Sequence, residues 1–402
     1  MIASYSNTYK KEFFFLGFVI AFNFYLIPFT NNSPRGTDLV SLYCLASLLY
    51  KWRTTKQIDL RHFIIIFYIL FAALIWLNIG FYKSHQAGIV EPIRWIILII
   101  PAYYLFLNLR TKQLKKWFFK GFFWGTLAHL IVIFVQLTGF GDYTKMFGLA
   151  SNDANFEVLF AGIFRPPGMY SHVNGSAAVI SLIVPLTIGF VDEKIISKKW
   201  ILLAAGILIL STILTLNRSS FLVSVIIILI WITFNIDRRL VLTLFAISFS
   251  LVIAFGYFFE PPGGWSRWFS YKSLYRNFSV RWLTVVESIK LIAENPFGMG
   301  SDYADELSKR TYSRGAATHN AWLQLSLSSG LFLPIIIFIG FLTKITNHIF
   351  YKKSLLGWLS IHLFGLFMFE EFLTNMVIIL FTIYILFSLF DYHIYKKVYV
   401  YS

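Results

Sequence analysis

The sequence predicts an all-α, polytopic integral membrane protein with about twelve transmembrane helices, because of its composition and its apolar stretches. Of the 402 residues, 57% are hydrophobic and only 13% are charged, about half of the roughly 25% that soluble domains carry. The mean hydropathy is +0.68. Apolar stretches of about 16–23 residues recur along the chain, the length that crosses a hydrocarbon core as a helix. A transmembrane barrel would show about ten-residue segments of alternating polarity instead.

The apolar stretches, taken in order, form one membrane domain over residues 1–402. The longest extramembrane piece is a loop at 260–320, between the ninth and tenth spans. The sequence shows no separate soluble domain and no internal repeat. The predicted spans are 13–29, 38–50, 62–82, 89–108, 117–138, 174–191, 200–217, 220–235, 240–259, 322–342, 355–369 and 373–390.

Lysine and arginine in the short loops indicate the orientation, because cytoplasmic loops carry an excess of both. With the N-terminus inside, the inside segments hold 21 of the 35 basic residues. Eight of the others fall in the 260–320 loop, and long loops cross the membrane largely regardless of charge. We therefore expect both termini in the cytoplasm and the segments 139–173 and 260–320 outside.

The 260–320 loop contains one predicted amphipathic helix, VRWLTVVESIKLIAEN, at 280–295. Its apolar residues recur at helical spacing, and Asn295-Pro296 is a stop signal. The expected apolar face consists of Leu283, Val286, Ile289 and Ile292. Such a helix is suited to lie at the membrane interface and cover a site there.

The first candidate for chemistry is Arg218, in TLNRSSFL between two apolar spans. An arginine at membrane depth costs roughly 2.5–3.5 kcal/mol on insertion scales, which makes it a functional hypothesis by default. The alternative is an arginine at a helix end whose head group reaches the interface. The outer position favours function, because basic residues are otherwise concentrated inside.

A second candidate is Arg165, in FRPPGMYSHVNGS. The two prolines and the glycine restrict the chain just before a span, which would aim Arg165 at the bilayer surface. His172 and Asn174 follow closely. The alternative is a rigid loop with an ordinary surface arginine.

A third candidate is Arg281, with Lys272 and Arg276 near it in the chain. Guanidinium groups bind phosphate oxygens bidentately, and a diphosphate offers enough oxygens for two of them. For Lys272 and Arg276, a solvated charged face is the favoured interpretation.

The fourth candidate is His319-Asn320, where the long loop re-enters the membrane. A histidine of near-neutral pKa can accept a proton from a hydroxyl nucleophile. Asn320 is suited to orient the imidazole or to bind a sugar hydroxyl. A lone histidine at a helix start is also often structural.

No motif for a cofactor or a metal is present. The sequence has no Cys/His metal-ligand spacing, no P-loop and no GxGxxG, and no D-x-D pair of the kind that nucleotide-sugar transferases use. We therefore expect a metal-independent transfer from a phosphorylated lipid, without a cofactor.

These motifs together resemble the O-antigen ligase and O-antigen polymerase superfamily. Arg218-Ser219-Ser220-Phe221-Leu222 is similar to the R-x3-L element of the ligases, and His319-Asn320 with Gly330 is similar to their H-[NSQ]-x9-G element. RPPGMYSHVNG, and the segment from Arg281 to NPFGMG, also resemble family segments. Leu333 stands where ligases often have threonine, so the resemblance is to the superfamily more than to the ligases alone.

The resemblance implies a transferase of the bacterial inner membrane, in cell-envelope and lipopolysaccharide biosynthesis, whose active site faces the periplasm. It would move a glycan from undecaprenyl diphosphate to a sugar hydroxyl, with inversion. Arg218 and Arg281, with Arg165, would bind the diphosphate, and His319 would be the general base, supported by Asn320 and Asn174. The expected partners are the lipid-linked donor, membrane lipids and an acceptor, and not nucleic acid.

Three functions remain open from the sequence. A ligase would use the lipid A core as acceptor, and a polymerase would use another lipid-linked repeat unit. A transporter of lipid-linked oligosaccharides is the alternative from another class. Transporters typically have internal repeats and charges at the midplane, whereas the candidate residues here gather on one predicted face.

Overall fold

The structure is a computed structural model, and its described residues form helices with one isolated β-bridge between Tyr25 and Arg35. The prediction of an all-α chain is therefore confirmed for the described part. The described residues are 7–27, 34–55, 60–82, 86–150, 166–170, 173–215, 217–235, 271–311, 318, 320–350, 354–369 and 375–390.

The helices follow one another along the chain with short connections. The first half contains α1 (Asn7–Phe22), α2 (Gly36–Thr55), α3 (Leu60–Tyr82), α4 (Gln86–Asn108), α5 (Lys112–Val135), the π-helix η1 (Gln136–Phe140), α6 (Gly141–Met146), α7 (Val173–Ser181) and α8 (Ile183–Asp192). The second half contains α9 (Lys199–Thr215), α10 (Arg218–Asn235), α13 (Tyr271–Glu294), η2 (Gly300–Asp302), α14 (Tyr303–Thr311), α15 (Ala321–Ser329), α16 (Phe332–Phe350), α17 (Leu355–Phe369), α18 (Met376–Phe387) and η3 (Ser388–Phe390).

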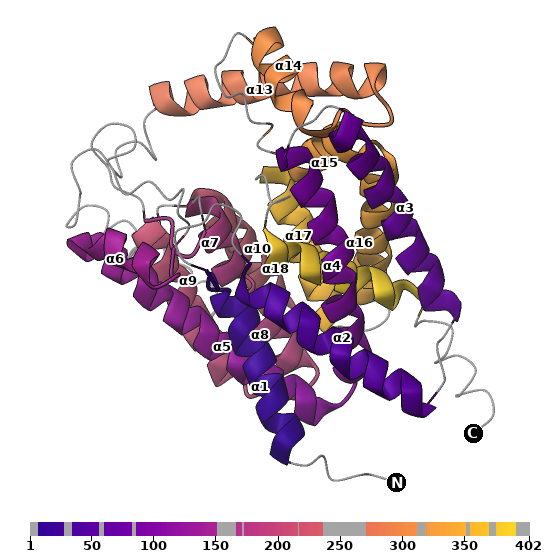
Figure 1. Ribbon diagram of the computed structural model, residues 1–402. Coiled ribbons are helices and arrows are strands. Elements are labelled where there is room, and N and C mark those ends of the chain that lie inside the picture. The colour runs from indigo at the N-terminus through magenta and orange to yellow at the C-terminus, as the bar shows by residue number, and fades with distance from the viewer. Residues whose placement is uncertain are drawn as a thin grey trace.

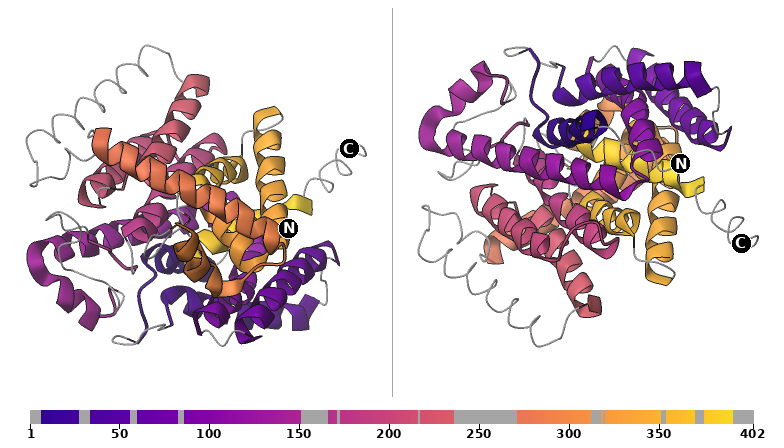
Figure 2. Two further views of the ribbon diagram at one scale, coloured as in Figure 1. Left: turned by 90° about the horizontal axis from the view of Figure 1, so that it is seen from above. Right: turned by 90° about the horizontal axis from the view of Figure 1, so that it is seen from below.

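Two helices, α13 and α14, lie across one end of a helical bundle (Figure 1). The second half of α13 packs against α14 and α15. Its first half extends over the part of the bundle that contains α7 and α10, as the view from above also shows (Figure 2). The start of α1 and the end of α18 lie away from α13. We call the end of the bundle that faces α13 the α13 side.

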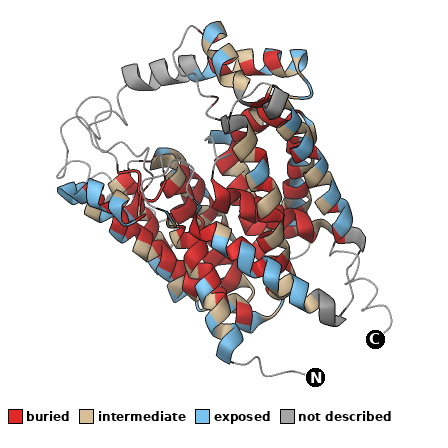
Figure 3. Ribbon diagram, in the orientation of Figure 1, coloured by how far each residue is buried: buried red, intermediate tan, exposed pale blue. Residues whose placement is uncertain are grey.

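The core lies where α1, α5, α8, α17 and α18 meet (Figure 3). All twelve residues of α18 are buried. A helix that is apolar all round belongs in the centre of a large bundle, and α18 takes that place. Exposed residues lie on the outer sides of the peripheral helices.

Helices α1 and α5 pack closely along glycines. A Cβ atom on Gly17 would overlap the Phe118 carbonyl oxygen, and one on Gly121 would overlap the Phe14 carbonyl oxygen. Small residues permit this close approach of two backbones, which replaces the hydrophobic driving force that is absent between helices in lipid.

Five helical stretches among the described residues are long and apolar enough to cross a membrane. They are His62–Ile79, Ile89–Asn108, Lys112–Met146, Val173–Asp192 and Phe332–Phe350. Four apolar helices are shorter: Lys199–Thr215, Arg218–Thr233, Leu355–Phe369 and Met376–Phe387. The chain is thus a membrane protein of several apolar helices, and the count of twelve spans stays a prediction. The predicted span 240–259 lies outside the described residues.

The predicted span 322–342 is divided in the structure. Helix α15 ends at Gly330, and the long apolar helix is α16. Gly330 has φ 76°, and a Cβ there would meet the backbone of Phe297. The NPFGMG turn packs at this break, where the Leu331 N–H donates to the Pro296 carbonyl oxygen (3.0 Å). The apolar pattern alone could not predict this break, because the contact joins segments that are distant in the sequence.

The predicted amphipathic helix at 280–295 is present as α13, which begins earlier and ends before Asn295 as expected. Its buried face, however, consists of Thr284, Ser288 and Leu291. Leu283 and Ile289 are 43% and 55% exposed. Of the predicted apolar face, Val286 and Ile292 are half-buried within the protein, and Ile292 packs beside Leu291. That the exposed part of this face meets the membrane interface stays a prediction.

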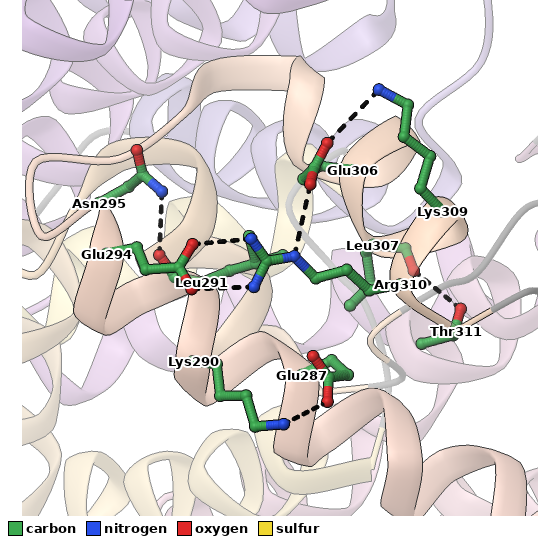
Figure 4. Close-up of polar contacts among 10 residues, drawn as sticks. All are labelled: Glu287, Lys290, Leu291, Glu294, Asn295, Glu306, Leu307, Lys309, Arg310 and Thr311. Carbon is green, nitrogen blue, oxygen red and sulfur yellow. Dashed lines mark hydrogen bonds and ion pairs between the residues drawn. The ribbon is translucent and has the colours of Figure 1, made fainter.

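A bidentate ion pair joins α13 to α14 (Figure 4). Arg310 donates from Nη1 and Nη2 to the two carboxylate oxygens of Glu294 (3.0 and 2.7 Å), and from Nε to Glu306 (3.4 Å). The hydrogen bonds from Arg310 hold the pKa of Glu294 below its usual range. The pair fixes the angle of this helical hairpin over the bundle.

Candidate functional site

Three helices on the α13 side begin with an asparagine cap. The side-chain oxygens of Asn217 and Asn320 accept the backbone N–H three residues later (2.9 and 3.1 Å). Asn375 accepts the N–H groups two and three residues later (3.1 and 3.3 Å). Caps of this kind satisfy the unpaired N–H groups of a first turn. They fix where α10, α15 and α18 begin.

The amide nitrogens of the same asparagines connect the helix starts with one another. Asn217 donates to the Oδ1 atom of Asn174 in α7 (2.7 Å). Asn375 donates to the carbonyl oxygen of the residue after Asn174 (3.0 Å), and Asn320 donates to the Met368 carbonyl oxygen near the end of α17 (3.3 Å). Hydrogen bonds therefore link the starts of α7, α10 and α18, and they fix α15 to α17.

Helix α2 joins this group through Thr37 in its first turn. The Thr37 hydroxyl oxygen lies 3.1 Å from the Met376 sulfur at the start of α18. Five helices, α2, α7, α10, α15 and α18, thus begin on the α13 side and are fixed by asparagine and threonine side chains; we call this group of helix starts the asparagine-capped face. The start of a helix carries partial positive charge, so this face favours an anion.

The predicted site residues are partly brought together. Arg218 is the first residue of α10 and is exposed on the asparagine-capped face. Asn174 and Asn320 belong to the same face through the hydrogen bonds given above. Arg165 and His319 lie outside the described residues. Asn320, directly after His319 in the chain, uses both ends of its amide to hold α15 in place.

Arg281 lies on a different element from Arg218. It is exposed on α13, whereas Arg218 is the first residue of α10. The side chains of Lys272 and Arg276 lie outside the described residues. Arg281 is therefore placed above the bundle with α13 and not within the asparagine-capped face.

The segment that follows Arg165 is buried and held by α5 and η1. Gln136 forms two hydrogen bonds with the Gly168 backbone, from Nε2 to the carbonyl oxygen (2.9 Å) and from the Gly168 N–H to Oε1 (2.8 Å). The Met169 N–H donates to His129 Nε2 (3.2 Å), and the Ser176 hydroxyl contacts both His129 and the Pro167 carbonyl oxygen. The rigidity expected from the prolines is thus supplied in part by polar side chains that the sequence did not single out.

One residue of this region that the sequence analysis missed is Arg35. It is 8% exposed, and its guanidinium carbon lies 4.8 Å from the ring centroid of Tyr25 and 5.3 Å from that of Tyr170. A signal for it existed, because Arg35 is a basic residue in a short predicted outside loop, the same argument that singled out Arg218.

Within the described ranges, no three His, Cys, Asp or Glu side chains lie close enough together to hold a metal ion. Metal independence stays a prediction for experiment.

Comparison with protein families gives a match at residues 203–338, about a third of the chain, to the family described as O-antigen ligase. No curated protein matches the sequence. The matched segment begins in α9, contains Arg218, Arg281, His319 and Asn320, and ends in α16. It leaves out Arg165 and Asn174. The resemblance inferred from the motifs is confirmed over this segment, which is similar to the O-antigen ligase family.

Proposed function

We propose that the protein is a glycosyltransferase that moves a glycan from undecaprenyl diphosphate to a sugar hydroxyl, at the periplasmic face of a bacterial inner membrane. The observation that carries the proposal is the asparagine-capped face, with Arg218 at the first residue of α10. Helix starts and guanidinium groups both bind phosphate oxygens. The match to the O-antigen ligase family supports a lipid-linked glycan as substrate in general.

The arginines would act on the leaving group. Arg218 and Arg281, with Arg165, bind the diphosphate and stabilise the charge that develops on it as its bond to C1 of the donor sugar breaks. Arg218 binds from the asparagine-capped face. Arg281 binds from α13, whose first half extends over α7 and α10.

His319 would be the general base. One ring nitrogen takes the proton of the acceptor hydroxyl while the hydroxyl oxygen forms the new bond to C1, and the diphosphate departs with the bonding electrons. Attack comes from the face opposite the diphosphate, so the anomeric configuration inverts. Asn320 positions His319 through the backbone, because its amide caps α15 and binds Met368. Asn174 positions Arg218 through Asn217.

The acceptor divides the proposal in two. We favour a ligase that uses the lipid A core, and a polymerase that extends another lipid-linked repeat unit is the second candidate. Both share the donor site. A transporter of lipid-linked oligosaccharides would move the donor without breaking its bond to the diphosphate.

The test uses the purified protein in detergent, with EDTA and an undecaprenyl diphosphate-linked glycan. One arm contains lipid A core and the other contains no second acceptor. A glycan joined to the core supports the ligase, and longer lipid-linked chains in the second arm support the polymerase. No release of undecaprenyl diphosphate in either arm contradicts the proposed transfer.

A further inference from the structure

Arg35 lies in the connection between α1 and α2, where the backbone holds it firmly. The residues around Tyr25 and Arg35 pair as an antiparallel bridge, with two backbone hydrogen bonds of 2.8 and 2.7 Å on either side. The Arg35 backbone N–H donates to Asp38 Oδ2 (2.6 Å), so Asp38 caps the start of α2. The position of the Arg35 side chain is thus set by the fold.

Two tyrosine rings flank the Arg35 guanidinium, at 4.8 Å for Tyr25 and 5.3 Å for Tyr170. Contacts of this kind stabilise a cation through the ring faces and use none of its N–H groups. The Nε and Nη1 atoms of Arg35 are buried and form no hydrogen bond with any residue that the structure describes. The Tyr25 hydroxyl oxygen is also buried and also forms no hydrogen bond with any residue that the structure describes.

Buried charged donors in proteins are nearly always hydrogen-bonded, since leaving one unsatisfied is costly. Guanidinium N–H groups match the oxygens of a phosphate or a carboxylate, so the buried Nε and Nη1 atoms of Arg35 are suited to bind one. Arg94 of α4 lies close enough to Arg35 for the two positive charges to interact. The carboxylates of Asp38 and Glu91 also interact with Arg94. Both carboxylates act on Arg94, while the buried Nε and Nη1 atoms of Arg35 remain for an oxyanion.

Arg35 adjoins the asparagine-capped face. The Tyr170 hydroxyl accepts a hydrogen bond from Asn23 (3.1 Å), and Asn23 accepts one from the Thr37 hydroxyl (3.0 Å), which also contacts the start of α18. Tyr170 lies against Gly175 in the first turn of α7, where a Cβ would be 3.3 Å from its ring. Arg35 and Arg218 are therefore connected through α7, at two places on one face.

We propose that Arg35, between Tyr25 and Tyr170, is a second oxyanion subsite of this face and binds a phosphate or a carboxylate of the lipid-linked substrate. The proposal rests on the proposed function, and it adds a binding residue outside the segment that matches the O-antigen ligase family. The oxyanion is either part of the lipid diphosphate or the carboxylate of an acidic sugar.

The experiment measures dissociation constants for the full chain in detergent with two probes. Farnesyl diphosphate represents the lipid diphosphate, and methyl glucuronide represents an acidic sugar. The variant Arg35→Gln removes the charge and keeps a polar side chain. The matched control is Arg110→Gln. Arg110 also contacts an aromatic ring, that of Phe106, but it lies just after the last residue of α4, whereas Arg35 lies near Arg94 in the first half of that helix. Arg218→Ala is the variant that tests the proposed function.

Arg35→Gln should weaken the binding of at least one probe about tenfold or more, while Arg110→Gln leaves both unchanged. A loss for farnesyl diphosphate assigns the subsite to the diphosphate, and a loss for the glucuronide alone assigns it to a sugar carboxylate. Unchanged binding of both probes to Arg35→Gln, with a lower melting temperature, would make Arg35 purely structural and overturn the proposal.

Two further variants serve if Arg35→Gln does not fold. Arg35→Lys keeps the charge without the fork, and Tyr25→Phe removes only the hydroxyl; weaker binding in either supports the subsite, and unchanged binding in both overturns it. One result would refute this subsite and leave the proposed function intact: Arg218→Ala weakens farnesyl diphosphate binding, while Arg35→Gln changes the binding of neither probe. A wild-type protein that binds neither probe refutes the proposed function with it.

Discussion

At the scale of single residues, asparagine does two things at the asparagine-capped face. The oxygen of each capping amide satisfies N–H groups of its own helix, and the nitrogen binds a neighbouring helix. Asn217 is the example next to the chemistry, because Arg218 follows it directly. The orientation of Arg218 is therefore fixed by α7 as well as by α10.

Arg218→Ala should lower transfer by about two to three orders of magnitude, because one preorganised contact to the developing charge is lost. Arg218→Lys should restore only part of the rate, since a point charge lacks the bidentate fork. Rates with the lipid-linked donor test this, with Arg110→Ala as the control arginine. If Arg218→Ala is well expressed and turns over at nearly the wild-type rate, Arg218 does not bind the leaving group and is only an arginine at a helix end near the membrane interface.

Glycine at the α1–α5 contact gives a prediction about stability. In Gly121→Ala the new methyl group would overlap the Phe14 carbonyl oxygen, so the variant should lose about 1–3 kcal/mol of unfolding free energy or more. The control is Gly206→Ala in α9, where a Cβ would meet no atom within 4 Å. That change should be neutral or slightly stabilising. Equal melting temperatures for the two variants would contradict the packing described for α1 and α5.

The sequence predicted those site residues whose signal lies in their own neighbourhood. Arg218 and Asn320 stand at the boundary between a polar connection and an apolar span, and both are found at helix starts. Arg35 was missed because its partners, Tyr25 and Tyr170, come from segments that only the fold brings together. Gln136 and His129 were missed for the same reason, since each reads as a polar residue within an apolar helix.

At the scale of elements, α13 shows what periodicity can and cannot predict. The pattern predicted the helix and its end at Asn295, but it did not predict that Thr284 and Ser288 would be buried beside Leu291. In a protein whose surroundings include lipid and interface, an apolar side chain such as Ile289 need not point inward, and Ser288 permits closer packing. The division of 322–342 into α15 and α16 was likewise invisible, because it depends on the contact between Gly330 and the NPFGMG turn.

The ion pair between α13 and α14 predicts a pH dependence of local opening. Because the folded pKa of Glu294 is lowered by Arg310, the pairing stabilises the hairpin above the ordinary glutamate pKa of about 4.3 and is lost as pH falls through the lowered value. Amides in Tyr303–Thr311, each compared with its intrinsic exchange rate at the same pH, should therefore be well protected at neutral pH and less protected in acid. Glu294→Gln should show the lower protection already at neutral pH.

The control for this experiment is Glu287→Gln. Glu287 pairs with Lys290 within α13 (2.6 Å), so its loss removes an ion pair without uncoupling the two helices. Exchange in α14 that rises equally in both glutamine variants would show that the Arg310 contact does not hold the hairpin.

At the scale of the whole molecule, composition predicted the fold class, and the charges of the loops predicted an arrangement that labelling can test. In a background without Cys44, cysteines at 112, 198, 238 and 396 should react only with reagents that enter the cytoplasm. Cysteines near 150 and 300, at the exposed positions 147 and 297, should react with reagents that stay outside. Position 297 is informative because it lies beside α13. A cytoplasmic position 297 would place the asparagine-capped face away from a periplasmic donor.

The number of spans is harder to predict from the sequence, for a physical reason. Helices such as α18, with twelve residues, are too short to cross a hydrocarbon core alone, yet they are buried in the centre of the bundle. Apolar length therefore measures burial in protein as well as burial in lipid, and only the packing distinguishes the two.

The central claim is that His319 is the base for a transfer whose donor is held by arginines. The direct test is the pH dependence of transfer in the wild type and in His319→Ala, together with the dissociation constant of undecaprenyl diphosphate. The wild-type rate should fall as pH drops through the histidine pKa, ordinarily about 6.5, because a protonated ring cannot accept the proton. His319→Ala should be slower by about two to four orders of magnitude, flat with pH, and nearly unchanged in donor binding. Intact turnover in the variant, or donor binding lost in proportion to turnover, would contradict the claim.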